Sequence, residues 1–278
     1  MHVQRHHDLA GFADLAAAML AADPVRHTVA LSVLDALQRA PTPDRPPPVL
    51  LSVHQGSALV GAAVRTPPQV LMCSALPQTT ADAVVGALAE LDPDLRGFTG
   101  PTAVVNALAE RAGRPVLAET RLRLFTLGRL VGPRGVRGQA RVAGPADAEA
   151  LGTWVDAFAA EARASIPRNG TDVVRQWVAT GAGAWVWEFD GAVVSLAKAG
   201  PPSAGMSRIG PVYTPAAHRG HGYAAAVTAA ASRWALAAGA RHVVLFTDLA
   251  NPTSNRLYPR VGFVPVGNHR EVWFTQPT

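Results

Sequence analysis

The sequence predicts an α/β (α+β) protein that is built from two copies of one unit. Strand-like and helix-like segments alternate along its 278 residues, and 49% of these residues are hydrophobic, which is enough for a buried core. Each half contains two strand-like runs joined by a turn dipeptide, Gly56-Ser57 in the first half and Asp190-Gly191 in the second. We therefore expect two domains, at residues 1–132 and 139–278.

A weak internal repeat supports the two copies. Four residues of the first half recur 149 positions later in the same order: Asn106, Leu108, Arg111 and Gly113 match Asn255, Leu257, Arg260 and Gly262. The two hairpins repeat at a smaller offset, 134 positions. The difference of 15 residues falls between the hairpin and the late strand, where the second half carries a glycine-rich loop. We expect the first copy to be degenerate and to lack this loop.

In the first copy, apolar patterning predicts a helix over 9–21, a hairpin of strands over 49–55 and 58–65, and a strand over 69–75. A helix should begin near Thr80, and the proline-rich segment 41–48 should be a rigid connector. In the second copy we expect helices over 144–162 and 171–181, a hairpin over 184–200 and a strand over 207–214. A helix over 222–238, a strand over 242–249, a short helix from Asn251 and strands after Gly262 should follow.

The composition limits the class of partner. The formal charge of +5 and the isoelectric point of 10.3 suggest nucleic acid, but the basic residues are almost all arginines scattered along the chain, with Lys198 as the only lysine. The densest basic stretch, 121–141, is typical of a strand followed by a solvated Gly/Arg linker. The single cysteine, Cys73, lies in an apolar run and is expected to be a core thiol. No leader-like or membrane-spanning run is found, so we expect a cytoplasmic protein without nucleic-acid or membrane partners.

A loop with two glycines precedes the helix expected over 222–238. Its residues, Arg219-Gly220-His221-Gly222-Tyr223-Ala224, would leave backbone N–H groups free at a helix start, where the helix dipole is positive. Such a nest suits the oxygens of a pyrophosphate, although a glycine-assisted helix entry is the simpler alternative. A dinucleotide-binding fingerprint would belong in the first strand–helix unit of the chain, and the Gly-Lys-Ser/Thr of a P-loop is absent.

Two motifs together resemble the GNAT superfamily of acyl-CoA-dependent acetyltransferases. The family's acyl-CoA signature, Arg/Gln-x-x-Gly-x-Gly/Ala, is matched by Arg219, Gly222 and Ala224. A second signature, Asn-x-x-x-Asn-x-x-Tyr-x-x-x-Gly-Phe, is matched by Asn251, Asn255, Tyr258, Gly262 and Phe263. The resemblance covers about residues 139–274, and the whole chain is similar to tandem GNAT proteins, of which mycothiol synthase is one example. It implies that each domain is a mixed, mostly antiparallel, twisted sheet flanked by helices.

The resemblance implies a binding site for acetyl-CoA or another short acyl-CoA. The pantetheine arm would lie along the strand that carries Val212, Tyr213 and Thr214, where a backbone N–H would stabilise the oxyanion. The N–H groups from Gly220 to Ala224 would hold the pyrophosphate, and Arg219 would add charge. The side chains of His221 and Tyr223 are expected to be peripheral, with a contact to the edge of the nucleotide left open.

Tyr258 is the expected general acid, because a phenol with a pKa of about 10 can give a proton to a thiolate with a pKa of about 8.5. Core packing on a short helix is the alternative. Asn251 should cap this helix and Asn255 should reach the pantetheine. The first copy has Ala109 at the position of Tyr258, so we expect it to be structural or to shape the acceptor pocket.

The general base is left open among Glu161, Glu188 and Glu271, each of which could instead be a solvated or ion-paired surface group. Glu161 is ranked first, because it lies on the helix pair that borders the acceptor site in the family. The cluster at 6–8, His-His-Asp, is expected to be solvated rather than metal-binding, and the chemistry should need no metal.

The sequence thus predicts an N-acetyltransferase that acetylates the primary amine of a small molecule or peptide by direct attack. A non-catalytic acyl-CoA-binding sensor is the alternative from another class. The acceptor, the acyl chain length and a homodimeric state are left open.

Overall fold

The computed structural model describes residues 1–39, 46–162 and 169–275. Residues 41–45 of the proline-rich segment lie outside this description. The chain divides into two compact units: unit 1 comprises Met1–Leu124 and Val266–Thr278, and unit 2 comprises Phe125–Pro265. Within the described residues, no helix is both long and apolar enough to cross a membrane. The domain boundaries expected from the sequence stay a prediction.

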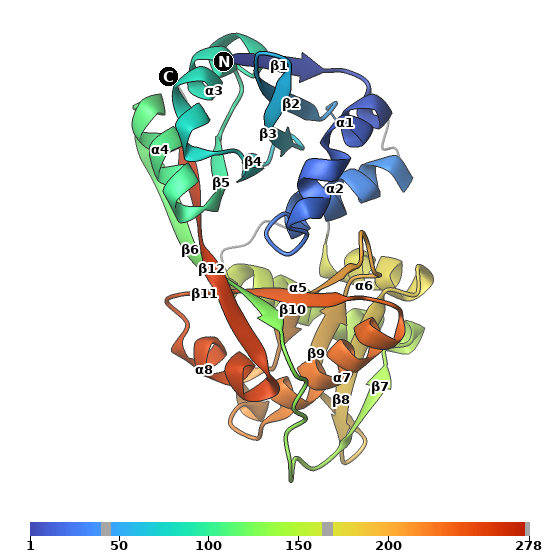
Figure 1. The fold of residues 1–278 in the computed structure, drawn as a ribbon. Coiled ribbons are helices and arrows are strands. Elements are labelled where there is room, and N and C mark those ends of the chain that lie inside the picture. The colour runs from blue at the N-terminus through green and yellow to red at the C-terminus, as the bar shows by residue number, and fades with distance from the viewer. Residues whose placement is uncertain (40–45, 163–168, 276–278) are drawn as a thin grey trace. The chain divides into compact units, whose positions relative to one another are not determined.

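The described residues of the first half form six strands and four helices, which Figure 1 shows as the blue to green part of the ribbon. They are β1 (His2–His6), α1 (Leu9–Ala22), α2 (Thr28–Arg39), β2 (Val49–Gln55), β3 (Ala58–Arg65), β4 (Leu71–Ala75), the 3-10 turn η1 (Gln78–Thr80), α3 (Ala81–Leu91), β5 (Gly97–Pro101), α4 (Thr102–Ala112) and β6 (Val116–Leu127).

The second half repeats this order, with one additional 3-10 turn after its first strand. It consists of β7 (Gln139–Val142), the 3-10 turn η2 (Pro145–Asp147), α5 (Ala148–Ala162), α6 (Gly170–Ala179), β8 (Gly183–Phe189), β9 (Ala192–Ala199), β10 (Met206–Tyr213), the 3-10 turn η3 (Ala216–His218), α7 (Tyr223–Ala237), β11 (His242–Asp248), α8 (Pro252–Val261) and β12 (Phe263–Phe274).

The strand pairing is the same in both copies. Unit 1 has the order β1-β2-β3-β4-β5 and unit 2 the order β7-β8-β9-β10-β11. In each, the first four strands pair antiparallel and the fifth pairs parallel with the fourth. The mixed, mostly antiparallel sheet with flanking helices confirms the predicted fold class (Figure 1).

The last strand of each copy is exchanged. In unit 1, β12 pairs antiparallel with β5 through His269–Pro101 to Trp273–Gly97. In unit 2, the end of β6 lies next to β11. The sequence did not indicate this exchange, because either strand could follow either sheet by its local pattern. The prediction of several strands after Gly262 was wrong, because one long strand, β12, runs to Phe274.

Each sheet is covered by helices on both faces. In unit 2, one cluster joins α7 to residues of β9, β10 and β11, including Ala197, Ala199 and Ile209. A second cluster joins α5 and α6 to the other face, including Leu151, Val174 and Leu196. Successive strand residues point to opposite faces, so β9 supplies both clusters in alternation. Cys73 is fully buried in the core of unit 1, which confirms its expected place.

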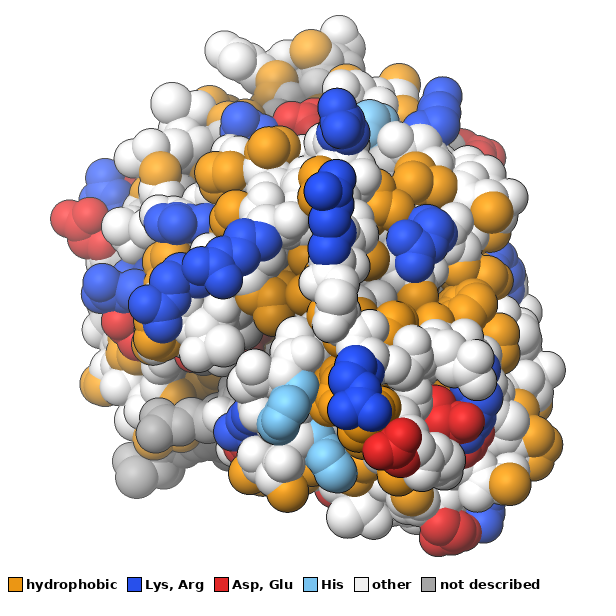
Figure 2. Space-filling model, turned by 90° about the horizontal axis from the view of Figure 1, so that it is seen from below, with side chains coloured by type: hydrophobic (Ala, Val, Ile, Leu, Met, Phe, Trp, Pro, Cys, Tyr) orange, Lys and Arg blue, Asp and Glu red, His pale blue; other side chains and the backbone are white. Residues whose placement is uncertain are grey.

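On the face drawn in Figure 2, basic side chains are interspersed with hydrophobic, acidic, histidine and uncharged surface. The absence of a nucleic-acid partner stays a prediction.

Candidate functional site

The glycine-rich loop lies between β10 and α7 in unit 2. Gly220 and Gly222 have φ angles of +87° and +81°, in the left-handed region that favours glycine. Gly222 is the N-cap of α7, and no side chain caps the helix. Among the described residues, the N–H groups from Gly220 to Ala224 have no acceptor. They form a set of free donors at the positive end of a 15-residue helix, and this donor set fits the oxygens of a pyrophosphate.

The strand before the loop separates from its neighbour. The parallel pairing of β10 with β11 extends from Met206–His242 to Ile209–Leu245, and it does not continue along the second half of β10. In the pairing of β10 with β9, the register shifts between Ile209 and Val212 of β10, which marks a bulge of β10 at the same place. The backbone of β10 after Ile209 is therefore left without a strand partner on the β11 side. Pro211 lies in this stretch and has no N–H, so Val212 and Tyr213 are the residues after it that could offer one.

Arg219 joins the loop to the end of α5. Its Nη2 lies 3.0 Å from both carboxylate oxygens of Glu161, and its Nε donates to the carbonyl oxygen of Thr214 at 2.9 Å. The hydroxyl of Tyr213 donates to the same carboxylate at 3.1 Å. The side chains of Arg219 and Glu161 are 50% and 56% exposed. Burial, followed by the bond to Glu161, raises the pKa of Tyr213 above its usual value. The contact holds the first-ranked base candidate beside the loop.

The C-terminal end of β10 is held by hydrogen bonds from the neighbouring strand β9. The buried hydroxyl of Ser195 donates to the carbonyl oxygen of Tyr213 at 3.1 Å and lies 2.8 Å from the hydroxyl of Thr214. The ring of Tyr213 packs on Trp154 of α5 with 6.3 Å between centroids. These contacts give β10 a defined end although β11 has left it. The sequence analysis missed Ser195. The one feature that could have indicated it is its polar side chain within an otherwise apolar strand.

The second motif builds the β11–α8 turn. Asn251 caps α8 by accepting from the N–H groups of Thr253 and Ser254, both at 3.1 Å, which confirms the predicted cap. Gly262 ends the helix with φ of +103°, and a Cβ there would lie 1.9 Å from the carbonyl oxygen of Arg129. The glycine is therefore required by both backbone conformation and space.

The side-chain amide of Asn255 is occupied in the structure. Its Nδ2 donates to the carbonyl oxygens of Asp248 and Asn251, both at 2.8 Å, and its Oδ1 accepts from Thr247 at 2.8 Å. The side chain therefore clamps the turn after β11. A contact between Asn255 and the pantetheine stays a prediction.

Tyr258 is buried on α8, with 7% of its surface exposed. Its ring packs on Phe263, with 5.9 Å between centroids, and lies 6.5 Å from Phe125. Its hydroxyl has no hydrogen-bond partner among the described residues. Burial raises the pKa of Tyr258 well above its usual value, so the phenol keeps its proton at neutral pH. This state suits a proton donor and equally a core residue.

The two aromatic residues of the loop differ in exposure. Tyr223 is buried and lies 6.1 Å from the ring of Phe189, so its side chain belongs to the core. His221 is exposed and stacks on Tyr223 at 5.4 Å. The guanidinium of Arg137 lies 4.7 Å from the centroid of the Phe189 ring.

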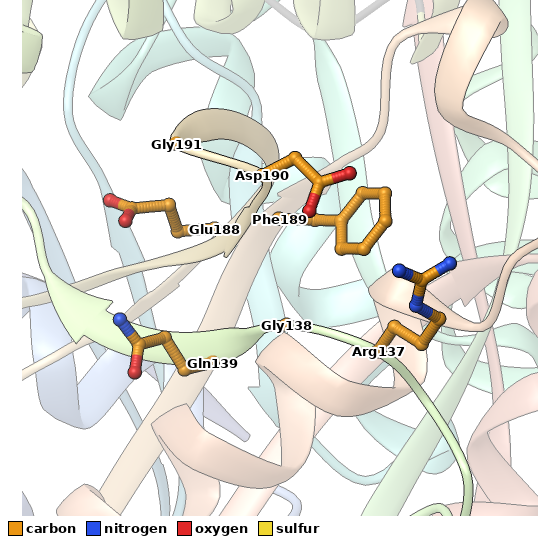
Figure 3. A pocket seen from close by; sticks show the side chains of 7 residues that line it. All are labelled: Arg137, Gly138, Gln139, Glu188, Phe189, Asp190 and Gly191. Atoms are coloured by element: carbon orange, nitrogen blue, oxygen red, sulfur yellow. The ribbon is translucent and has the colours of Figure 1, made fainter.

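A surface pocket of about 440 Å³ lies beside this aromatic stack. Figure 3 shows its lining, with Arg137 turned toward the ring of Phe189. The lining residues are Arg137, Gly138, Gln139, Glu188, Phe189, Asp190 and Gly191. Glu188 also pairs with Arg141 at 2.6 Å, as the ion-paired alternative for this residue suggested. The pocket offers the loop an adjoining basic and aromatic surface.

The remaining candidates lie outside this cluster. Glu271 belongs to unit 1, where its carboxylate accepts from the indole N–H of Trp273 at 2.9 Å. Asp8 caps α1, and the ring of His6 lies 2.7 Å from the hydroxyl of Ser52. No set of three metal-ligating side chains occurs in the described part of the chain.

The matching place in unit 1 has different chemistry. The helix α3 starts with Asp82 in its first turn, and this carboxylate pairs with Arg111 of α4 at 2.5 Å. Neither glycine nor a free cation precedes the helix in 76–81. A carboxylate at this helix start disfavours a phosphate there. This arrangement supports the prediction that the first copy lacks a pyrophosphate-binding loop.

Comparison with known proteins identifies the second half. The model of the acetyltransferase (GNAT) family matches residues 152–263. This part of the chain belongs to the GNAT family. The match supports an acyltransferase, and acetyl transfer is the general reaction of the family. No curated protein matches the sequence.

Solved structures show the fold of the whole chain. A GNAT-family acetyltransferase from Colwellia psychrerythraea has a TM-score of 0.65 at 13% identity, over 99% of this chain and 100% of that chain. A tandem GNAT protein from the clavulanic acid biosynthesis pathway has a TM-score of 0.62 at 13% identity, over 100% and 99%. A GCN5-related N-acetyltransferase from Sphaerobacter thermophilus has a TM-score of 0.63 at 18% identity, over 98% and 93%. The predicted tandem GNAT fold is confirmed.

Proposed function

We propose that unit 2 is an acetyl-CoA-dependent N-acetyltransferase that acetylates the primary amine of a small molecule or a peptide. The observation that carries the proposal is the set of free N–H groups from Gly220 to Ala224, next to the end of β10 where β11 has separated. Together they offer a pyrophosphate cradle that continues into an unpaired strand edge.

Two sets of backbone groups share the binding of the acyl-CoA. The backbone donors of Gly220, Gly222 and Ala224 hold the pyrophosphate, and the unpaired edge at Val212 and Tyr213 holds the pantetheine. When bound, acetyl-CoA or another short acyl-CoA supplies the thioester whose acetyl group passes to the amine. An N–H of β10 after Pro211 then stabilises the carbonyl oxygen as it gains negative charge.

Two proton movements accompany the transfer. The amine nitrogen forms a bond to the acetyl carbon while the C–S bond breaks, so the nitrogen must lose one proton and the thiolate must gain one. Tyr258 holds the proton for the thiolate. Glu161, or a water molecule between it and the amine, accepts the proton from the nitrogen, and this role requires the carboxylate to turn away from Arg219.

The test is an assay of acetyl transfer to a panel of primary amines, in which the release of the CoA thiol is measured. The Gly222→Glu variant, which places a carboxylate in the cradle, serves as the inactive control. We expect thiol release that depends on both amine and cradle. Thiol release that is unchanged in Gly222→Glu would contradict the proposal.

A second candidate, a non-catalytic acyl-CoA sensor, is favoured by one observation, the burial of Tyr258 without a polar partner. This candidate predicts acyl-CoA binding with no acetylation of any amine in the panel.

A further inference from the structure

The only lysine of the chain occupies an unusual place. Twenty-four of the 25 basic residues are arginines, so Lys198 of β9 is the one ammonium side chain among them. It is partly buried, and its Nζ lies 6.0 Å from the ring centroid of Trp177 on α6. Its neighbours Ala197 and Ala199 belong to the cluster under α7. Because β-strand residues alternate, Lys198 points to the opposite face, toward α5 and α6.

Arg208 of β10 lies on the same face. Gly200 donates to the carbonyl oxygen of Arg208 at 2.9 Å, and Ala199 pairs with Ile209, so Arg208 is the diagonal neighbour of Lys198 across the two strands. Diagonal neighbours are about 7 Å apart, within reach of long side chains. Ile209 belongs to the cluster under α7, which places Arg208 on the α5–α6 face as well.

Among the described residues, no side chain of opposite charge contacts either cation. Neither forms an ion pair with a carboxylate in the part of the chain that the structure describes. Burial, and then the charge of Arg208, lowers the pKa of Lys198 to about 8. Like charges on neighbouring strands are unfavourable, and partly buried cations normally have a counter-charge. An anion between the two side chains would therefore stabilise the arrangement.

The pair lies where β10 leaves β11. Ile209, directly after Arg208, is the last residue of β10 that pairs with β11. The bulge of β10 begins there, opposite Lys198 and Ala197 on β9. The proposed pantetheine edge at Val212 starts three residues further on. An anion between the two cations would thus be bound close to the start of that edge.

We propose that Lys198 and Arg208 bind an oxyanion, a carboxylate or a phosphate group, that the acceptor carries in addition to its amine. The acceptor is then an anionic amine such as an amino acid or an amino phosphate ester. This inference rests on the proposed function for its meaning, but the anion site itself can be tested without turnover.

The first experiment uses the small number of amines in the protein. Lys198 and the α-amino group are the two amines that an acylating reagent can label, so the α-amino group is an internal reference. Labelling is quantified by mass spectrometry at constant ionic strength in chloride, acetate or inorganic phosphate. We expect acetate or phosphate to slow labelling of Lys198 several-fold and to leave the α-amino group unchanged. Equal labelling of Lys198 in all three salts would overturn the anion site.

The second experiment identifies the anion on the acceptor. Propylamine, β-alanine and phosphoethanolamine are compared by kcat/KM for thiol release from acetyl-CoA. We expect the preferred anionic amine to exceed propylamine roughly 10- to 100-fold, as one charged contact would give. The comparison between β-alanine and phosphoethanolamine distinguishes carboxylate from phosphate.

Matched variants assign the preference to the pair. Lys198→Met and Arg208→Met should bring kcat/KM for the anionic amine down to the level of propylamine. Lys198→Arg and Arg208→Lys keep the charges and should retain the preference, and Arg233→Met, an exposed arginine of α7, should behave as the wild type. Thermal unfolding checks that each variant is folded.

The outcomes separate the two proposals. Protection of Lys198 by anions without any acetyl transfer would support the anion site and contradict the enzymatic function. Transfer without preference for anionic amines, or a preference that survives in Lys198→Met and Arg208→Met, would overturn the role of the pair in acceptor binding.

Discussion

Arg219 of the glycine loop contacts both carboxylate oxygens of Glu161, with Nη2 at 3.0 Å from each. The contact joins a cofactor-binding candidate to the first-ranked base candidate, although 58 positions separate them in the sequence. The guanidinium is thereby held toward the end of α5, beside the donors of the loop. Both side chains are exposed, so the ion pair contributes little to the stability of the fold and acts mainly by positioning Arg219 and Glu161.

We expect Glu161→Gln to lower kcat/KM for the amine while it leaves folding nearly unchanged. The exposed ion pair contributes less than about 1 kcal/mol to the free energy of unfolding. Acyl-CoA affinity should be equal or higher, because Arg219 is released. Steady-state kinetics and calorimetry of acetyl-CoA binding give these quantities, with Glu149→Gln as the control for an exposed carboxylate of α5. Full activity in Glu161→Gln would remove Glu161 as the base.

Tyr258→Phe removes one hydroxyl from a buried ring. Because general acid catalysis typically contributes a factor of about 10² or more, we expect kcat to fall by that order with little change in acetyl-CoA affinity. The variant Phe263→Leu alters the packing of Tyr258 but keeps its hydroxyl, and therefore serves as the structural control. If the two variants lost activity equally, core packing would explain the position.

The lowered pKa of Lys198 predicts a pH dependence of stability. The pKa of about 8 in the folded protein lies below the ordinary lysine pKa of 10.5. The charged side chain therefore destabilises the fold fully below pH 8, and this penalty is gone above about pH 10.5. Stability of the wild type relative to Lys198→Met should therefore rise between pH 8 and 10. Urea unfolding of both proteins at pH 7.5 and 9.5 measures the difference. A constant difference would show that the ammonium is not desolvated.

The buried pair Arg65–Asp92 is expected to matter to unit 1. Arg65 is 1% exposed, contacts Asp92 directly and donates to the carbonyl oxygens of Gln69 at 2.7 Å and Asp94 at 2.8 Å. Arg65→Met would leave the Asp92 carboxylate buried without its cation, which costs about 3–5 kcal/mol of unfolding free energy. Denaturant unfolding tests this value. The double variant Arg65→Met/Asp92→Leu should recover part of the loss, and no recovery would argue against an uncompensated charge.

The fold was predictable where its signals are local. The turn at Asp190-Gly191, the cap Asn251 and the glycines of the loop each act through their own backbone conformation, and the structure has them where the sequence indicated. The edge strands β1 and β7 were missed, because both are short and rich in polar residues. The helix α2 was missed as well, and its buried face becomes visible only against the sheet.

In the candidate site, too, only the features that depend on local sequence were predictable. The donors of the loop follow from glycine spacing, whereas the contact of Arg219 with Glu161 depends on how α5 packs beside β10. The same holds for Lys198 and Arg208, which are ten residues apart on two strands and meet through the register of β9 and β10. Alternation fixes the face of each residue only after that register is known.

Thermal unfolding with and without acetyl-CoA tests the central claim, that the start of α7 in unit 2 is a pyrophosphate cradle. At 100 times its Kd, the ligand should add about 2.7 kcal/mol to the free energy of unfolding. We predict this increase for the wild type and its loss in an Arg219→Glu/Gly222→Glu variant, with the Asp82→Asn variant at the matching helix of unit 1 behaving as the wild type. No increase in the wild type, or one that survives in the double variant, would contradict the account.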